Sequence, residues 1–477
     1  MRNTKVICTL GPAVDNEESI EALIRAGMNC ARFNFSHGNH ESHLATLNRL
    51  KSVRDRLGAP VAAMLDTKGP EIRVKTFKNN SVELEAGARF TLTSRDVEGT
   101  EKIVSVTYDH LAEELSEGNV ILIDDGLIGL RVESINGPDI HCVVESGGPL
   151  SNNKSINIPG VHINLPALTE KDIRDLEFAA ENDFDAIAAS FIRSASDVKA
   201  IRKVLKENNA SDILVISKIE NQEGVDNVDA IIKASDGVMV ARGDLGVEIP
   251  AARVPVIQKQ IIRKCQTAGK IVITATQMLD SMIRNPRPTR AEVSDVANAV
   301  FDGTDCVMLS GETAGGKHPI EALQTMVEIV KEAEQSVDYW TIFNDSRLAD
   351  RTQINDAVTH TCCLTARDLQ ARAIICPTQS GHTARMISRF RPGCKIVALT
   401  MTERVRRQMC FCWGVIPGLI GLVDTTDRLL SYSLEEAYKM RQVDNGDTCV
   451  ITAGIPIGQT GSTNLIKACE VDFNEEN

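Results

Sequence analysis

Lys218 and Glu220 stand two residues apart at the end of an apolar run, in the stretch ILVISKIENQEGV. Because side chains two apart on a β-strand point the same way, both charges would project together from the end of such a strand. Asp244 follows the next apolar run, in ARGDLG, and adds a second carboxylate. Two carboxylates, completed by water and substrate oxygens, are a usual ligand set for Mg²⁺. Lys218 would then face a substrate, whereas the alternative is a simple ion pair between Lys218 and Glu220.

A second group of oxygen-bearing side chains follows two earlier apolar runs. The group consists of Asn34, Ser36, Asp66 and Thr67. One formal charge among several neutral oxygens suits a monovalent cation better than a divalent one. The alternative is that Ser36 and Asp66 cap helices or turns.

Four further residues at these strand ends could bind an anionic substrate. Arg32 and Arg73 could donate paired hydrogen bonds to phosphate oxygens. Gly243 would let a ligand approach the backbone, where amides at the start of a helix or turn bind carboxylate or phosphate. Thr276, in TATQ, would supply a hydroxyl group. A plain tight turn for Gly243 and a structural hydroxyl for Thr276 are the alternatives.

Strands must position these residues, and the chain alternates short apolar runs with amphipathic helical patterns. Strands are predicted at Lys5–Leu10, 29–35, 61–66, 185–190, 213–218, Gly237–Ala241, 270–274 and 305–309. Helices are predicted at Glu17–Ala26, His40–Leu57, Glu170–Glu181, 196–208, 251–268 and 319–337. Apolar runs of this length between helices indicate parallel strands buried on both faces. The pattern predicts a (β/α)₈ TIM barrel with its chemistry at the C-terminal strand ends, and a doubly wound sheet is the alternative.

Two other regions interrupt or follow the barrel pattern. Between the third strand and its helix lies a segment far longer than an ordinary βα loop. Its alternating stretches SVELEAGARFTLT and NVILIDDGLIGLRVESI predict an inserted small β-barrel domain, which could act as a lid. After about residue 340 a new α/β pattern begins. The predicted domains are therefore a barrel over 1–68 and 167–338, an insert over 69–166 and a C-terminal α/β domain over 339–477.

Composition excludes several classes of protein. The 477 residues carry a formal net charge of −13, which argues against a nucleic-acid partner. The 13 cysteines are scattered without any C-x-x-C, which fits buried thiols in a reducing compartment. We see no signal peptide and no apolar run long enough for a bilayer. We therefore expect a cytoplasmic protein with no membrane partner.

The motifs together resemble the pyruvate kinase family. ARFNFSHG, LDTKGPEIR, ISKIENQEGV, VARGDLGVEIP and MLSGETA stand in the family's order, and DDGLIG, NIPGV and TAGIPIGQTGSTN match in the two other domains. The resemblance is to bacterial members without an extra phosphohistidine-type domain. It implies the last step of glycolysis, in which phosphoenolpyruvate and ADP give pyruvate and ATP. It also implies Mg²⁺ (or Mn²⁺) and K⁺ as cofactors, a homotetramer, and activation by a phosphorylated effector bound to an allosteric C-terminal domain.

The resemblance also implies a role for each matching residue. The catalytic residues would be Lys218, Arg32 and Thr276. The substrate would be bound by Arg32, Lys218, Gly243, Asp244 and Thr276. Mg²⁺ would be held by Glu220 and Asp244, and K⁺ by Asn34, Ser36, Asp66 and Thr67. The nucleotide would be bound by Asn34, His37, Arg73 and Lys154.

Three details of the resemblance concern cofactor use, the proton donor and the effector. Glu71 falls where K⁺-dependent members have Glu, which implies K⁺ dependence. The donor of the proton to the enolate stays open between Thr276, through water, and Lys218, with Ser310 and Glu312 nearby in the family pattern. The implied effector-binding residues are Thr378, Ser380, Gly381, Thr383 and Thr463. Because these loops lack the Lys or Arg common in members activated by fructose 1,6-bisphosphate, sugar monophosphates and AMP stay open as effectors.

Two rival functions make different predictions from the sequence. A catalytically silent effector sensor would lose at least one of Lys218, Glu220, Asp244 and Thr276, yet all four are present. Another barrel enzyme that stabilises a pyruvate enolate on a metal, such as an aldolase or lyase, would explain the two carboxylates. It would not explain the insert, the oxygen group at Asn34 to Thr67, or the C-terminal domain.

Overall fold

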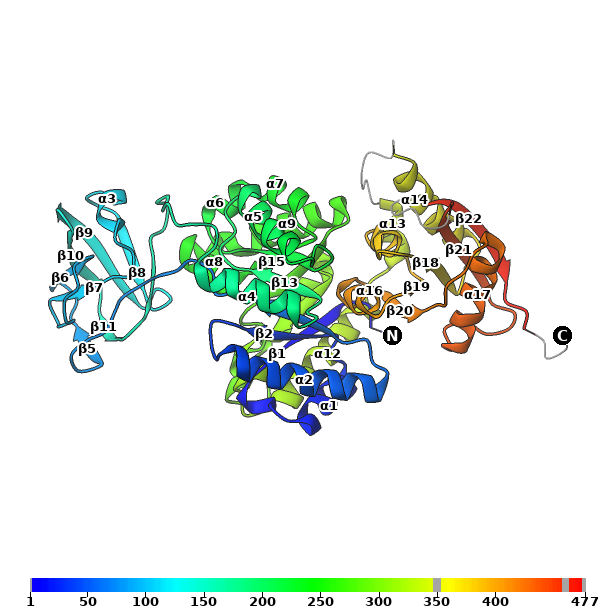
Figure 1. Ribbon diagram of the computed structural model, residues 1–477, viewed down its shortest axis with the longest axis horizontal. Helices are drawn as coiled ribbons and strands as arrows, with labels where there is room; N and C mark the ends of the chain where they lie inside the picture. The colour runs from blue at the N-terminus through cyan, green and yellow to red at the C-terminus, as the bar shows by residue number, and fades with distance from the viewer. Residues whose placement is uncertain (1, 346–352, 457–462, 474–477) are drawn as a thin grey trace.

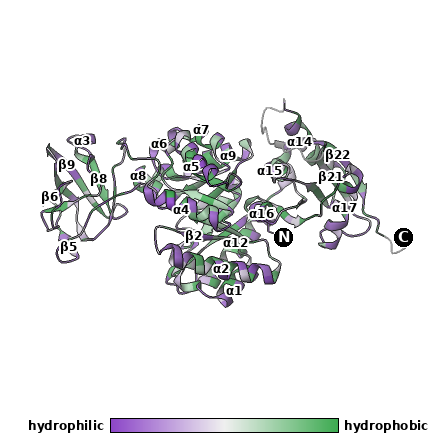
Figure 2. Ribbon diagram, viewed as in Figure 1, coloured by the Kyte–Doolittle hydropathy of each residue, from purple (hydrophilic) through white to green (hydrophobic). Residues whose placement is uncertain are grey.

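The computed structural model describes residues 2–345, 353–456 and 463–473. Figure 1 shows three bodies in a row: a small β domain, a central barrel and a C-terminal α/β domain. In Figure 2 hydrophobic residues gather in the interior of each body, and hydrophilic residues colour much of the outer helices. Within the described residues, no helix combines the length and the apolar character that crossing a membrane requires.

Eight parallel strands close into the central barrel in the order β1-β17-β16-β15-β14-β13-β3-β2. Their bounds are β1 Lys5–Leu10, β2 Cys30–Asn34, β3 Ala62–Asp66, β13 Ala186–Ala189, β14 Leu214–Ile219, β15 Gly237–Ala241, β16 Ile271–Ala275 and β17 Cys306–Leu309. Closure is made by β1 and β17, with Lys5 opposite Cys306. The predicted TIM barrel is therefore confirmed, and the doubly wound alternative is wrong because an open sheet would leave these two strands unpaired.

Helices surround the barrel, and several of them begin or end at capping residues. Their bounds are α1 Glu17–Ala26, α2 His40–Leu57, α4 Glu170–Glu181, α5 Ala195–Glu207, α6 Gln222–Asp226, α7 Val228–Ala234, α8 Arg242–Glu248, α9 Val254–Ala268, α10 Arg290–Asp302, α11 Gly311–Ala314 and α12 Pro319–Gln335. The helix α2, for example, starts at an Asn39–Ser42 capping box and ends at Gly58, whose φ is +61°. The predicted helix 251–268 begins with a 3₁₀ turn at Ala251–Arg253, before Pro255 in the first turn of α9.

The insert is a curled sheet in the order β4-β12-β8-β9-β10-β6-β7, with β11 and β5 as a separate pair. The bounds are β4 Ile72–Arg73, β5 Ser81–Leu84, β6 Arg89–Thr93, β7 Ile103–Ser105, α3 Leu111–Glu114, β8 Val120–Ile123, β9 Ile128–Asn136, β10 Asp139–Ser146, β11 Gly148–Ser151 and β12 Ser155–Asn157. Backbone hydrogen bonds join its two edges, from the Lys75 amide to the Ser105 carbonyl (2.7 Å) and from the Thr107 amide to the Arg73 carbonyl (2.9 Å).

 The sheet thereby closes on itself, as the prediction of a small β-barrel requires.

The C-terminal domain is a five-stranded sheet in the order β20-β19-β18-β21-β22, with only β22 antiparallel to its neighbour. The bounds are α13 Tyr339–Asp345, α14 Ile354–Asp368, β18 Ala373–Pro377, α15 His382–Ser388, β19 Lys395–Thr400, α16 Glu403–Gln408, β20 Val415–Leu419, α17 Thr426–Lys439, β21 Thr448–Gly454 and β22 Thr463–Glu470. The predicted α/β class of this domain is confirmed. The residue limits given above for the three domains stay a prediction.

Candidate active site

Lys218 lies at the centre of a buried polar cluster at the C-terminal end of the barrel strands. Its Nζ is 3.0 Å from Glu220 Oε1 and 3.1 Å from Asp66 Oδ1, and it donates a hydrogen bond of 2.8 Å to Ser190 Oγ. Lys218 is only 9% exposed. The structure therefore brings together side chains from the ends of β3, β13 and β14, and it places Lys218 and Glu220 side by side.

The carboxylates around Lys218 keep it charged. Burial alone would lower the pKa of Lys218, but Asp66, Glu220 and Asp244 outweigh burial and raise it. Burial would likewise raise the pKa of Asp66, yet Arg32 and Lys218 hold it below its usual value. The cluster thus holds a permanent ammonium group and an ionised Asp66 in a largely dry site.

The two carboxylate oxygens of Glu220 have different partners. Its Oε2 accepts a hydrogen bond of 2.6 Å from the Phe191 amide. Its Oε1 is buried and lacks a hydrogen-bond partner among the described residues, although Lys218 Nζ lies close enough for an ion pair. Burial raises the pKa of Glu220, and Asp244 adds to the effect. A buried carboxylate oxygen that lies near a second carboxylate fits a divalent cation.

The predicted K⁺ group is only partly brought together. Asn34 and Asp66 are direct neighbours on β2 and β3, and Asn34 Oδ1 accepts a hydrogen bond of 3.2 Å from the amide of Ser36. The Asp66 carboxylate also accepts a bond of 2.6 Å from Arg32 Nε. The side chain of Thr67 is turned to the Ala188 carbonyl at 3.5 Å. Asp66 therefore faces two cations of the protein, and Ser36 is exposed.

Thr276 and Gly243 meet where β15 and β16 end. The Gly243 amide donates a hydrogen bond of 3.0 Å to Thr276 Oγ1, which donates one of 2.6 Å to the Ala275 carbonyl. Thr276 has φ +69°, which is unusual for a β-branched residue. Arg242 supports this turn. Its Nη2 donates a hydrogen bond of 2.8 Å to the Thr276 carbonyl, and its Nη1 donates one of 2.7 Å to Asp295. The hydroxyl is thus held in a strained turn that Arg242 supports.

Because Arg242 supports the turn without lying in the cluster, its loss should misplace Thr276. We expect Arg242→Leu to lower kcat/KM by up to about 10²-fold, the cost of a displacement of about 1 Å at a reacting group. Steady-state kinetics with varied substrate would measure the loss, and Arg263→Leu on the exposed side of α9 is the control. An Arg242→Leu enzyme as active as the control would show that the turn keeps its shape unaided.

A cavity of about 410 Å³ lies between the insert and the mouth of the barrel. Glu71, Arg73 and Asp125 line it from the insert, and Asp244 and Glu248 line it from α8. Asn157 Nδ2 donates a hydrogen bond of 2.8 Å to Glu248 Oε1 across the two domains. Burial raises the pKa of Asp125, and Asp244 adds to the effect. Acidic groups of both domains therefore face one another across a space large enough for a small ligand.

Of the four predicted nucleotide-binding residues, Arg73 lines this cavity, and Asn34, His37 and Lys154 are not among its described lining residues. Arg73 and Ser155 are register partners on β4 and β12, which places Lys154 beside Arg73. Arg73 Nη2 forms an ion pair of 2.6 Å with Glu71, and Lys154 Nζ forms one of 2.8 Å with Asp124. Asn34 and His37 belong to the barrel side, after β2, and His37 is exposed.

The predicted effector residues gather where β18 meets α15. Thr383 and Thr463 are buried, and their hydroxyls lie 2.8 Å apart. Gly381 has φ +74° and precedes α15, and the Thr378 amide donates to the Leu399 carbonyl. The rest of the second effector loop, residues 457–462, lies outside the described residues. The structure thus joins the two loops through one pair of threonines.

Sequence reasoning missed two contributors to the cluster. Ser190 bridges Lys218 and the Thr67 carbonyl, to which its hydroxyl donates a bond of 2.6 Å. The Phe191 amide binds Glu220 from a backbone with φ +54°. Ser190 ends the fourth predicted strand and Phe191 follows it, in ASFIR, so their place at a strand end was the available signal.

Comparisons with known proteins agree with this geometry. A family model described as "Pyruvate kinase, barrel domain" matches residues 1–323, and one described as "Pyruvate kinase, alpha/beta domain" matches residues 356–469. A pyruvate kinase of Clostridium acetobutylicum is 50% identical over 473 residues, which cover 99% of this chain and 100% of the relative. One of Sporosarcina psychrophila is 50% identical over 98% of this chain and 80% of its own. The crystal structure of a pyruvate kinase from Cryptosporidium parvum superposes with a TM-score of 0.92 at 40% identity, covering 98% of this chain and 96% of that one. The chain belongs to the pyruvate kinase family.

Proposed function

We propose that the cluster around Lys218 carries the phosphoryl transfer of the pyruvate kinase reaction, in which phosphoenolpyruvate and ADP give pyruvate and ATP. The observation that supports it most is the buried Lys218 ammonium, held between Asp66, Glu220 and Ser190. Phosphoryl transfer needs positioning and neutralisation of charge more than covalent chemistry. In this proposal Lys218 and Arg32 neutralise the phosphoryl group in flight, and Lys218 also stabilises the enolate left behind.

Glu220 and Asp244 would hold Mg²⁺ or Mn²⁺. The buried Glu220 Oε1 supports this assignment, because it lies beside Lys218 without a well-directed hydrogen bond and can still bind a metal cation. The metal would supply a further positive charge next to the substrate oxygens. Among the described residues no group of three or more acidic, histidine or cysteine side chains could hold a metal. A site of two carboxylates that leaves positions for substrate is consistent with that finding.

The remaining residues would orient the substrates around this centre. The Gly243 and Asp244 amides, with Thr276, would hold the carboxylate of phosphoenolpyruvate. Arg73 and Lys154 would bind the nucleotide from the insert, opposite Asn34 and His37. Because the carboxylates around Lys218 raise its pKa, Lys218 keeps its proton, which favours a proton donor to the enolate on the Thr276 side.

The proposal extends to regulation, assembly and location. A phosphorylated effector would bind at the loop of Thr378, Ser380, Gly381 and Thr383, with Thr463 beside it. The enzyme would work as a homotetramer. All 13 cysteines are free, which suits a reducing cytoplasm.

The decisive assay is pyruvate release from phosphoenolpyruvate and ADP with Mg²⁺, in K⁺ and then in Na⁺ buffer. We expect much higher turnover in K⁺, because a site of one carboxylate and neutral oxygens suits a monovalent cation. Glu71→Lys should raise the turnover in Na⁺ towards that in K⁺, since it places a fixed cation next to Arg73 in the same cavity.

The assay can contradict the proposal in two distinguishable ways. Equal turnover of the unchanged enzyme in both salts would remove the K⁺ assignment and leave the reaction standing. Absence of turnover under every condition would revive the silent effector sensor, which keeps the fold without the chemistry.

A further inference from the structure

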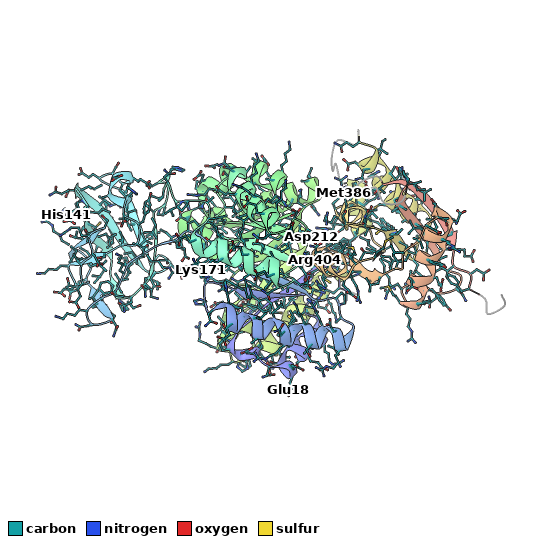
Figure 3. All side chains as sticks on the ribbon, in the orientation of Figure 1. Glu18, His141, Lys171, Asp212, Met386 and Arg404 are labelled. Atoms are coloured by element: carbon teal, nitrogen blue, oxygen red, sulfur yellow. The ribbon has the colours of Figure 1, made fainter. Side chains whose placement is uncertain are left out.

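A second cavity, of about 430 Å³, lies between the barrel and the C-terminal domain, on the opposite side of the barrel from the insert. Thr267 and Lys270 line it from the end of α9 and the start of β16. Arg385 and Arg389 line it from α15. Met386, labelled in Figure 3, lies at this junction, and Gly269 approaches it so closely that a Cβ there would overlap the methionine methyl group. The cavity is therefore formed by both domains together.

Two carboxylates line this cavity, and arginines already neutralise both of them. Asp356 forms an ion pair of 2.7 Å with Arg389, and Asp236 forms one of 2.9 Å with Arg202. Within the described part of the chain, Lys270, by contrast, donates only to the Ser235 carbonyl. These pairings leave no carboxylate of the lining for the remaining cations.

Among the described residues, Lys270 and Arg385 consequently form no ion pair with a carboxylate. Arg385 Nη1 donates a weak hydrogen bond of 3.3 Å to the Ser380 carbonyl, and neither cation has an ion-pair partner among residues 2–345, 353–456 and 463–473. Burial lowers the pKa of Lys270; Asp236 opposes this, and Arg385 adds to it. The surplus of two charges in a partly dry space favours an anion.

Two buried polar atoms of the lining residues also lack partners. Arg389 is 5% exposed, and its Nε has no hydrogen-bond partner among the described residues. Asn355 Oδ1 likewise has no hydrogen-bond partner among the described residues, although the Nδ2 of Asn355 lies 2.7 Å from His382 Nε2. Buried polar groups are normally satisfied, so an unpaired donor of Arg389 beside two free cations points to an absent acceptor-rich ligand.

We propose that this cavity binds a phosphate monoester and thereby braces the barrel against the C-terminal domain. A phosphate monoester carries close to two negative charges at neutral pH, which match the surplus of Lys270 and Arg385. Its oxygens would accept hydrogen bonds from cations of both domains, and the volume suits a small metabolite. The lining shares His382 with the loop at Thr378 to Thr383, but it contains none of the five predicted effector residues, so this anion site lies beside the effector site proposed above. Sugar phosphates and nucleoside monophosphates share the recognised group.

Calorimetric titration of the full chain with ribose 5-phosphate, AMP and orthophosphate tests the proposal. We expect Lys270→Gln, in the barrel, and Arg385→Gln, in the C-terminal domain, each to weaken binding of the best probe at least about tenfold. Arg372→Gln removes an exposed arginine of the C-terminal domain and should leave binding unchanged. Ser380→Ala tests the effector loop proposed above, and it keeps the backbone carbonyl to which Arg385 donates a hydrogen bond. Comparison of the sugar phosphate with AMP identifies the source of the phosphate group.

Each outcome decides the matter. Parallel losses in the two variants from different domains, with Arg372→Gln and Ser380→Ala unaffected, support the proposal. The best probe should then also raise the Tm of the unchanged protein by more than it raises that of either variant. Binding that only Ser380→Ala weakens, equal losses in Arg372→Gln, or no binding of any probe by the unchanged protein would overturn it. Circular dichroism establishes that the two variants are folded, and a loss of binding in only one of them would also overturn the proposal.

Discussion

Replacement of Lys218 by methionine is expected to lower kcat by about 10³-fold or more, while binding of Mn²⁺ stays close to that of the unchanged enzyme. Methionine has a similar length but no charge, so the variant removes the ammonium that faces Asp66 and Glu220 at about 3 Å. The carboxylates proposed to hold the metal stay in place. Because the lost interaction acts on charge that develops during transfer, the loss should appear in kcat more than in KM.

Mn²⁺ binding followed by electron paramagnetic resonance separates this effect from general damage. Lys264→Met is the matched control, since Lys264 forms an exposed surface pair with Asp229 on the outside of the barrel. We expect the control to keep full turnover. A Lys218→Met enzyme with normal kcat would refute the central role of Lys218, and one that no longer binds Mn²⁺ would show that Lys218 supports the metal site instead.

The strands of the barrel were predictable because parallel strands buried on both faces leave short, nearly continuous apolar runs. The pairing that closes the barrel was not predictable from those runs. It places Lys5 opposite Cys306, about 300 residues away, and local spacing is the same in an open sheet. The TIM barrel was therefore chosen over the doubly wound sheet by the number of repeats and by the resemblance.

The site was predictable where it depends on one strand and less so where it depends on several. Lys218 and Glu220 lie side by side because of the two-residue period of a single strand. The contact of Lys218 with Ser190 and Asp66 depends on the register among β3, β13 and β14, which the sequence does not encode locally. The left-handed backbone of Thr276 had no signal either, because β-branched residues seldom adopt it.

The other large effect is expected far from the active site, at the junction of the barrel and the C-terminal domain. Asp185 is fully buried at the start of β13, where Arg407 Nε donates to its Oδ1 at 2.8 Å and the Ala63 amide donates to its Oδ2 at 2.8 Å. Arg407→Leu would remove the nearest cation of this carboxylate and leave the more distant Arg54, whose Nη1 lies 3.9 Å away. We expect a loss of stability of about 3–5 kcal/mol at pH 8, the usual cost of breaking a buried pair by removing one partner.

The loss of stability caused by Arg407→Leu should be smaller at acid pH. Burial, opposed by Arg407, raises the pKa of Asp185 to about 6 from a usual 3.8. A folded-state pKa above the unfolded value means that this group stabilises the protein most below pH 4, and that its contribution is lost as the pH rises through 6. A protonated Asp185 needs no cation, so Arg407→Leu should lower the Tm less at pH 5 than at pH 8. Thermal unfolding of both proteins at the two pH values measures the difference.

Two further variants decide whether the buried charge is the cause. Arg404→Leu, on the same helix α16, loses only pairs with the more exposed Asp183 and Asp212, and Figure 3 labels Arg404 and Asp212 at this junction. It should cost less than about 1 kcal/mol at either pH. Adding Asp185→Asn to Arg407→Leu should restore part of the stability at pH 8, because the amide carries no charge and can still accept from Ala63. A different result would be an equal loss of stability in Arg407→Leu at pH 5 and pH 8, with no stability restored by Asp185→Asn. Arg407 would then stabilise the junction through packing. The charge of Asp185 would be balanced by Arg54, whose Nη1 lies 3.9 Å away.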